Sequence, residues 1–172
     1  MDNFTSKDLN FIRYDKKYAE ECHKTFMSQE QTARYTLWRP TNNVDEAITK
    51  LENWETNVKD CGFFRLIQEK ESGQVIGFIC TAEVESGVYD HLGIAIGQNF
   101  LRRGYGFQTL TAVIDYVKNS GGKEIHYSHF KANEASKNLA LKCGFKYVRE
   151  AKRIRRYDGK EFDEVFYILK IK

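Results

Sequence analysis

The chain has 172 residues, of which 41% are hydrophobic and 14% aromatic, enough for one well-buried core but little for two. We therefore expect a single domain over residues 1–172. The net charge of +3, from 27 basic and 24 acidic side chains, is too balanced to indicate a nucleic-acid surface by itself.

The sequence carries no sign of export or of a membrane. Residues 1–7 lack the basic-then-apolar order of a signal peptide, and no apolar run approaches the roughly 20 residues that span a bilayer. The four cysteines are widely spaced and form no Cys-x-x-Cys pair, so we expect neither disulfides nor a cysteine metal site. We expect a cytoplasmic protein without a membrane partner.

The first third of the chain is predicted to form a strand, a helix and an aromatic loop. Apolar and polar residues alternate over residues 9–14, as in a half-buried strand, and Asp15 offers an N-cap for the helix that follows. The loop at residues 35–40 contains Tyr35, Trp38 and the only proline. Its two aromatic side chains either cover the core or line a substrate cleft, and the sequence leaves both open.

An amphipathic helix and three strands come next. Asn43 has the spacing of a capping box and precedes apolar residues that recur on one helix face. Apolar runs over residues 62–68 and 74–81 are joined by a turn, and a second turn leads into a strand over residues 88–96. We expect these three strands to form an antiparallel meander.

The second half of the chain alternates helix and strand. Phe107, Leu110, Ile114 and Val117 mark the expected buried face of a helix. The strand over residues 125–130 should lie parallel to the strand before that helix, because a strand, helix, strand order gives a right-handed crossover.

The chain ends with a helix and a hairpin. The helix is predicted to start at Asn133 and to end before Gly144. Strands over residues 145–157 and 160–171 flank an Asp-Gly pair, the strongest hairpin signal in the chain. The fold class is therefore α/β (α+β), with a mixed, mostly antiparallel sheet flanked by helices.

The turn after residues 88–96 has the features of an anion site. Residues 102–106, Arg-Arg-Gly-Tyr-Gly, lead straight into a helix, so several backbone N–H groups lie at the positive end of the helix dipole. The glycine, lysine and Ser/Thr cluster of a P-loop is absent, and Thr109 replaces the third glycine of a dinucleotide fingerprint. The antiparallel strands before the turn also argue against a fully parallel nucleotide fold.

These features resemble the GNAT superfamily of N-acetyltransferases, whose motif is Arg/Gln-x-x-Gly-x-Gly/Ala after a strand. Gly104 and Gly106 match the motif, whereas Leu101 stands where Arg or Gln is usual. Asn133-x-x-Ser136 followed by Gly-Phe matches the second signature of the family. The resemblance covers the chain from about residue 9 to residue 171.

Within this superfamily, the segment with Tyr35, Trp38 and Pro40 before an amphipathic helix resembles the branch that acetylates N-terminal amines of ribosomal proteins. The resemblance implies an N-acetyltransferase that uses acetyl-coenzyme A as co-substrate and no metal. Its expected acceptor is the N-terminal amine of a protein, with Tyr35 and Trp38 as substrate contacts. A small amine, such as a polyamine, an amino acid or an aminoglycoside, is the alternative.

The resemblance also implies where acetyl-coenzyme A binds. The pyrophosphate would lie on the N–H groups of the turn, and the pantetheine arm would pass between two parallel strands that splay apart. Backbone N–H groups of one strand would hold the thioester oxygen. Arg102 and Arg103 add charge toward phosphate or are exposed turn residues. The residues assigned to this binding are Ile94, Ala95, Ile96, Arg102, Arg103, Gly104, Tyr105, Gly106, Asn133 and Asn138.

The acceptor amine must lose a proton, which requires a general base. Asp90 and His91 are adjacent on a strand, so we expect their side chains to point to opposite faces and one of them to reach the cleft. His91 is preferred, because an unperturbed histidine pKa of about 6.5 suits a base at neutral pH. A strand histidine without a catalytic role is the alternative.

The general acid is less defined, because Ala140 stands where many family members have a tyrosine. Ser136 is the candidate, although a serine in the first turn of a helix often binds only backbone N–H groups. A thiol with a pKa of about 8.5 leaves as a thiolate without an acid.

Other interpretations of the sequence are less favoured. His126 and His129 are three apart on a strand and face opposite ways, which argues against a shared metal ion. The basic run over residues 149–156 is expected to pair with acidic residues across the hairpin rather than with nucleic acid. A non-catalytic acyl-coenzyme A sensor and an RNA-binding domain are the alternatives from other classes, and assembly as a homodimer is possible.

Overall fold

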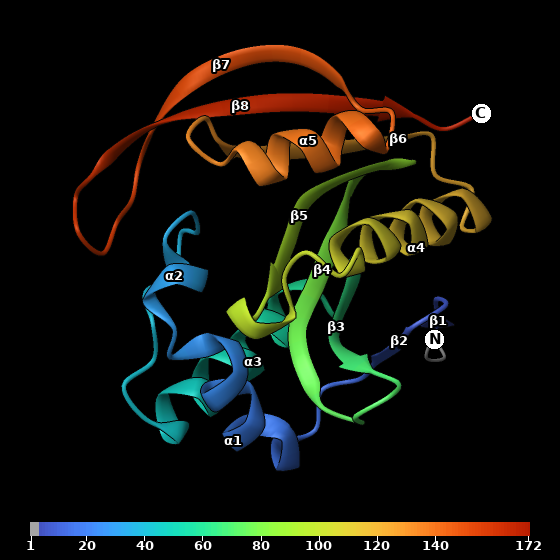
Figure 1. Cartoon of the computed structure of the whole chain (residues 1–172). Coiled ribbons are helices and arrows are strands. Elements are labelled where there is room, and N and C mark those ends of the chain that lie inside the picture. The colour runs from blue at the N-terminus through green and yellow to red at the C-terminus, as the bar shows by residue number, and fades with distance from the viewer. Residues whose placement is uncertain (1–3) are drawn as a thin grey trace.

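The computed structural model describes residues 4–172, except for the side chain of His91. Eight strands form one sheet in the order β1-β2-β3-β4-β5-β6-β8-β7, with helices on both faces (Figure 1). The strands are β1 (Phe4–Thr5), β2 (Leu9–Ile12), β3 (Gly62–Glu69), β4 (Val75–Glu85), β5 (Val88–Ile96), β6 (Glu124–Phe130), β7 (Lys146–Ile154) and β8 (Glu161–Lys170). The helical segments are η1 (Lys16–Tyr18), α1 (Ala19–Cys22), η2 (His23–Met27), α2 (Glu30–Ala33), α3 (Val44–Val58), η3 (Gln98–Phe100), α4 (Tyr105–Asn119) and α5 (Glu134–Lys142).

The sheet is mixed and mostly antiparallel, as predicted. Among the described residues, β5 and β6 form the parallel pair, and the other neighbouring strands run antiparallel. The predicted meander is β3, β4 and β5, and the predicted hairpin is β7 and β8. None of the helices in residues 4–172 combines the length and apolar character needed to cross a membrane.

Local sequence signals explain where the first helices begin. The Asp15 carboxylate accepts a hydrogen bond from the N–H of Lys17 and caps η1. The side-chain oxygen of Asn43 accepts from the N–H of Glu46 and caps α3. The Glu46 carboxylate accepts from the N–H of Asn42, one residue earlier than in a standard capping box.

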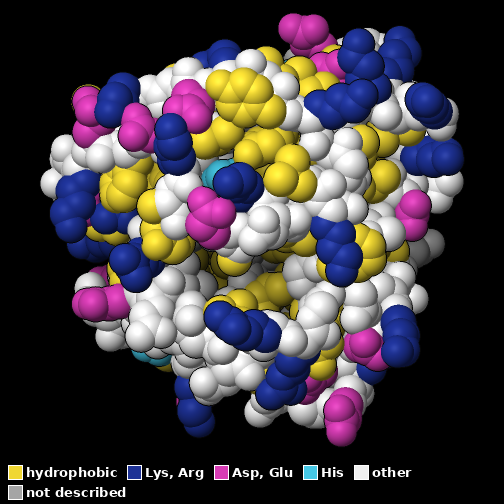
Figure 2. Space-filling model, turned by 45° about the horizontal axis from the view of Figure 1, so that its top comes forward, with side chains coloured by type: hydrophobic (Ala, Val, Ile, Leu, Met, Phe, Trp, Pro, Cys, Tyr) yellow, Lys and Arg dark blue, Asp and Glu magenta, His cyan; other side chains and the backbone are white. Residues whose placement is uncertain are grey.

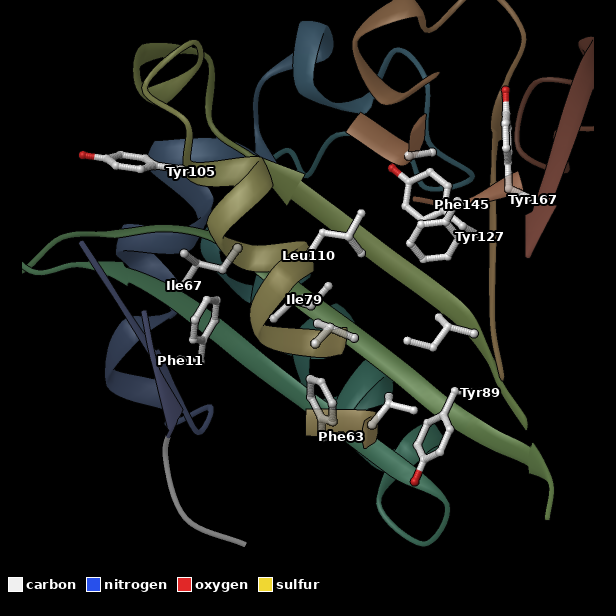
Figure 3. Close-up of a cluster of buried hydrophobic side chains, with 14 of the residues drawn as sticks. Phe11, Phe63, Ile67, Ile79, Tyr89, Tyr105, Leu110, Tyr127, Phe145 and Tyr167 are labelled. Carbon is white, nitrogen blue, oxygen red and sulfur yellow. The ribbon is translucent and has the colours of Figure 1, made fainter. Parts of the chain in front are cut away.

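The core has two layers, one on each face of the sheet. α4 and α5 cover one face, where the cluster drawn in Figure 3 contains Ile79, Leu110 and Tyr127. α1, η2 and α3 cover β3 and β4 on the other face, with Phe26, Leu51 and Phe78 in their cluster.

The predicted buried face of α4 is partly wrong. Phe107 is 37% exposed, and its ring lies 4.4 Å from the Lys142 ammonium. The helix begins at Tyr105, whose side chain is buried, and this rotates the buried stripe toward Thr109 and Val113. Leu110 and Val117 are buried as predicted.

Candidate active site

A gap in the sheet separates β5 from β6. The two strands pair only at Val88 with Glu124 and at Tyr89 with Ile125, although β5 continues to Ile96. On its other edge, β6 pairs with β8 along its whole length, from Glu124 to Phe130. Figure 1 shows the consequence, because β3, β4 and β5 run down the molecule whereas β7 and β8 arch over its top. The predicted splayed pair of parallel strands is confirmed.

A β-bulge lies beside the gap. Cys80 of β4 is opposite Gly93 of β5, and Ala82 is opposite Asp90, so β5 contains one extra residue between them. Strict alternation would put Tyr89 and Ala95 on the same face of the sheet. They lie in opposite core clusters.

The bulge corrects the expectation that side-chain directions on this strand follow simple alternation. Opposite faces for Asp90 and His91 require a regular strand, and the extra residue removes that condition. His91 itself lies in β5, and its side chain is outside the described part of the chain. Its proposed role as a base stays a prediction.

The turn before α4 has the backbone of an anion cradle. Gly104 has φ 79°, and Arg102 has φ 61°, the single positive φ of a non-glycine among residues 4–172. Within those residues, the amides of 102–106 have no protein acceptor, and no side chain caps α4. A Cβ built on Gly104 would meet nothing within 4 Å, so the turn faces open space. Such unpartnered amides at a helix N-terminus favour a bound anion.

Glu69, at the end of β3, holds this turn in place. Its side chain is 6% exposed and accepts hydrogen bonds from Tyr105 Oη at 2.5 Å, Arg103 Nη1 at 3.1 Å and Ser72 Oγ at 2.6 Å. The bonds from Ser72 and Tyr105, with the Arg103 charge, lower the pKa of Glu69, which keeps the carboxylate ionised. Both arginines are exposed, and Arg103 is directed at a protein carboxylate.

Sequence reasoning missed Glu69, because it lies 34 residues from Arg103 and belongs to no local motif. The only local signal is an acidic residue at the end of an apolar strand, which also describes many solvated turns.

The start of α5 places Ser136 next to a buried phenol. The side-chain oxygen of Asn133 accepts from the N–H of Ser136, as predicted for an N-cap. The Ser136 hydroxyl lies 2.6 Å from Tyr127 Oη, and burial raises the pKa of Tyr127 to about 12. Asn138 is exposed on α5. Sequence reasoning did not single out Tyr127, whose spacing marks it only as a core residue.

Three titratable side chains meet where β5 and β6 part. His126 Nε2 lies 2.7 Å from Glu124 Oε1, and His126 Nδ1 lies 3.4 Å from Asp90 Oδ2. Burial lowers the pKa of His126, but the hydrogen bond to Glu124 and the Asp90 charge outweigh it and raise the pKa above its ordinary value. The described residues contain no group of three side chains suited to a metal ion.

Of the two loop aromatics, Trp38 lies against the α3 side of the core. Trp38 packs edge-on against Trp54, with ring centroids 5.7 Å apart, and the Lys50 ammonium lies 5.9 Å from the Trp38 ring. Tyr35 is partly exposed beneath the Arg34 guanidinium, 5.1 Å away. Trp38 therefore covers the core, and contact of either ring with an acceptor stays a prediction.

The basic run of the hairpin is partly neutralised, as predicted. Lys152 pairs across the strands with Glu161 at 3.3 Å and Asp163 at 2.8 Å. Arg155 is buried and binds Asp158, and it also donates to the carbonyl of Arg34.

Comparison with known proteins shows which family this chain is similar to. Among solved structures, the chain is similar to RimL, a ribosomal L7/L12 alpha-N-protein acetyltransferase in complex with coenzyme A, with TM-score 0.86 and 15% identity over 99% of this chain and 98% of that one. It is also similar to a putative ribosomal-protein-serine acetyltransferase from Vibrio cholerae, with TM-score 0.79 and 21% identity over 98% and 97% of the two chains.

A third similar structure is the microcin C7 self-immunity acetyltransferase MccE in complex with acetyl-CoA and AMP, with TM-score 0.83 and 19% identity over 96% of this chain and 93% of that one. No curated protein sequence matches. The family model of the acetyltransferase (GNAT) domain matches residues 8–146. The chain, with its split sheet and its glycine turn, therefore belongs to the GNAT acetyltransferase family.

Proposed function

We propose that the protein transfers the acetyl group of acetyl-coenzyme A to a primary amine, and that the preferred acceptor is the N-terminal amine of a protein, such as a ribosomal protein. One combined observation carries the proposal. The strand pair β5 and β6 is open beyond Tyr89, and the turn that follows β5 presents unpartnered amides to open space. A long, anionic molecule with an extended tail fits such a gap and turn.

The described residues fit the co-substrate as follows. The amides of 103–106 would hold its pyrophosphate, and Glu69 fixes the turn that carries them. The amides of Ile94 and Ile96 would face the acyl end, where β6 no longer occupies that edge of β5, because the N–H groups alternate along a strand and that of Gly97 bonds to Ile76 on the β4 side. Acetyl-coenzyme A supplies an acetyl group activated as a thioester.

The surface is consistent with this arrangement. Figure 2 shows a hollow near the middle of one face of the molecule, with hydrophobic side chains at its floor and both Lys or Arg and Asp or Glu side chains at its rim. Apolar walls suit a pantetheine arm, and the basic side chains of the rim suit phosphates.

The preference for a protein N-terminus rests on the loop with Tyr35 and Trp38 and on the similarity to RimL, which acts on ribosomal protein L7/L12. A small cationic amine is the second candidate, because the Asp90 carboxylate at the gap is 42% exposed. Asp90 and His91 are the candidates for the base that the sequence offers, and Ser136 is its candidate for an acid.

Mass spectrometry after incubation with acetyl-coenzyme A tests the proposal. The acceptors are peptides with N-terminal serine, alanine and methionine, together with spermidine and free amino acids. We expect a single acetyl group on the α-amine of a peptide. Acetylation of spermidine alone would contradict the preferred acceptor, and calorimetric binding of acetyl-coenzyme A without transfer to any amine would reveal a non-catalytic sensor.

A further inference from the structure

Asp90 and His126 stand on the two sides of the point where the sheet opens. Tyr89 and Ile125 form the last parallel pair of β5 and β6, and Asp90 and His126 are the next residues on each strand. Their side chains meet across the opening, with His126 Nδ1 3.4 Å from Asp90 Oδ2. A group at this position is adjacent to whatever passes through the gap.

His126 faces the side of the sheet that α4 and α5 leave uncovered. β6 has a regular register with β8 from Glu124 to Phe130, so its side chains alternate strictly. Ile125 and Tyr127 belong to the cluster beneath α4 and α5, which places His126 on the opposite face. The anion turn lies at the start of α4, so the co-substrate and His126 approach the gap from different faces.

The surroundings of His126 suit a proton acceptor. Glu124 Oε1, 2.7 Å from Nε2, accepts a hydrogen bond from Nε2–H and so fixes the ring orientation and tautomer. The Nδ1 contact with Asp90 is longer than a good hydrogen bond, and the side chain is 33% exposed, so Nδ1 is within reach of a third group. A carboxylate that orients an imidazole is the usual support of a histidine base.

The charges around His126 favour a cationic acceptor. Asp90 from β5 and Glu124 from β6 lie against the ring, whereas β8 places the uncharged Ile168 opposite His126 and Lys170 opposite Glu124. Two carboxylates near one imidazole stabilise the imidazolium that forms when a proton arrives.

We propose that His126 is the general base for the acceptor amine, with Glu124 as its positioning residue and Asp90 as the carboxylate that attracts the amine to the opening. The assignment rests on the proposed function. An N–H bond of the cationic amine breaks first, and its proton moves to Nδ1, which frees the nitrogen lone pair. The neutral nitrogen then bonds to the acetyl carbon, and the C–S bond breaks with its electron pair on sulfur. The imidazolium and the acylated nitrogen each release one proton to water, and the thiolate takes up one proton from water.

Steady-state kinetics of single variants test this role. We expect His126→Gln to lower kcat about 100-fold or more, the usual effect of losing a general base, with little change in the KM for acetyl-coenzyme A. His23→Gln is the matched control, because His23 contacts Thr41 on the helical side of the molecule. The acceptors are an N-terminal-serine peptide and spermidine, and His91→Gln is measured in parallel.

The titration of His126 gives a readout that does not depend on activity. In the free protein, NMR of the histidine Cε1–H groups should show His126 titrating above the ordinary value of about 6.5, and Glu124→Gln should lower its midpoint. The kcat/KM of the wild type should rise with pH through the same midpoint, because the base must be neutral, and Glu124→Gln should shift that rise to lower pH.

The possible outcomes distinguish a failure of the assignment to His126 from a failure of the proposed acetyltransferase function. A wild-type rate in His126→Gln, with a large loss in His91→Gln, would overturn the assignment to His126 and leave the acetyltransferase standing. A midpoint that Glu124→Gln does not move would overturn the role of Glu124. If the wild type acetylates neither acceptor, the proposed function fails, and the assignment fails with it even where the NMR midpoint agrees.

Discussion

The two sides of the β5–β6 gap are built in different ways. On the α4 side, the turn at residues 102–106 is a backbone feature, with two positive φ angles and amides for which the described residues supply no hydrogen-bond acceptor. On the other side, Asp90, Glu124 and His126 form a side-chain cluster from two strands. The turn depends on local conformation, whereas the cluster depends on strand register, so the two sides should respond to different substitutions.

A charge added to the turn should have the largest effect on that side. Gly104→Asp places a carboxylate in the open space above the amides, and we expect acetyl-coenzyme A to bind about 100-fold more weakly, which corresponds to roughly 3 kcal/mol. Isothermal titration calorimetry measures the Kd for acetyl-coenzyme A. Gly121→Asp is the matched control, because Gly121 has φ 78° and a Cβ at that position would also meet nothing within 4 Å. Equal losses in both variants would contradict an anion site at Gly104.

Removal of the support beneath the turn should have a smaller effect. Glu69→Gln weakens the bonds from Arg103 and Tyr105, and we expect about tenfold weaker acetyl-coenzyme A binding, because a bond to a charged group contributes about 1.5–3 kcal/mol. Glu71→Gln, an exposed residue in the same β3–β4 turn, is the control. Unchanged affinity in Glu69→Gln would show that the turn holds its shape alone.

The same bonds predict a pH dependence. Since the pKa of Glu69 is lower in the folded protein, its contribution to stability is present above the unfolded value of about 4.3 and is lost as pH falls through the folded pKa. Urea unfolding as a function of pH should show this acid loss in the wild type and less of it in Glu69→Gln.

Ser136→Ala tests whether the α5 side of the gap supplies an acid. We expect kcat to be unchanged and the free energy of unfolding to fall by about 1–3 kcal/mol, because the buried Tyr127 hydroxyl loses its partner. The double variant with Tyr127→Phe should recover part of that stability. A large loss of kcat at unchanged stability would instead support Ser136 as the acid.

The smallest expected effect concerns strain in the turn. Arg102→Gly should raise the free energy of unfolding by about 1 kcal/mol, because glycine adopts the φ of 61° without the steric cost of a side chain. Thermal unfolding measures the gain as a rise of about 2–4 °C for a chain of this size. Arg103→Gly should be destabilising, because Arg103 has no positive φ and loses its bond to Glu69.

Local features of the fold were predictable from the sequence. Glycines at turns with positive φ, capping residues such as Asn43 and the apolar runs of β3 and β4 act within a few residues, so hydrophobic patterns and turn chemistry reveal them. The gap itself was expected only through resemblance to a family. It depends on where two strands far apart in the sequence stop pairing, which no local pattern contains.

The side-chain part of the site was not predictable in the same way. The bulge in β5 adds one residue and breaks the alternation on which the comparison of Asp90 with His91 depends. The sequence suggests only a metal-binding role to consider for His126. Its contact with Asp90 depends on the pairing of β5 with β6, which the spacing does not reveal. Periodicity assigns Phe107 to the core wrongly, because an apolar residue near the start of a helix is ambiguous.

Backbone NMR during titration with coenzyme A tests the central claim most directly. The account predicts that the largest amide shift changes occur at residues 103–106 and at Ile94 to Ile96, with Gly121 and Gly159 unaffected. Changes confined to the cavity of about 470 Å³ beside Lys17, Glu21 and Gln74, or no change at 103–106, would contradict it.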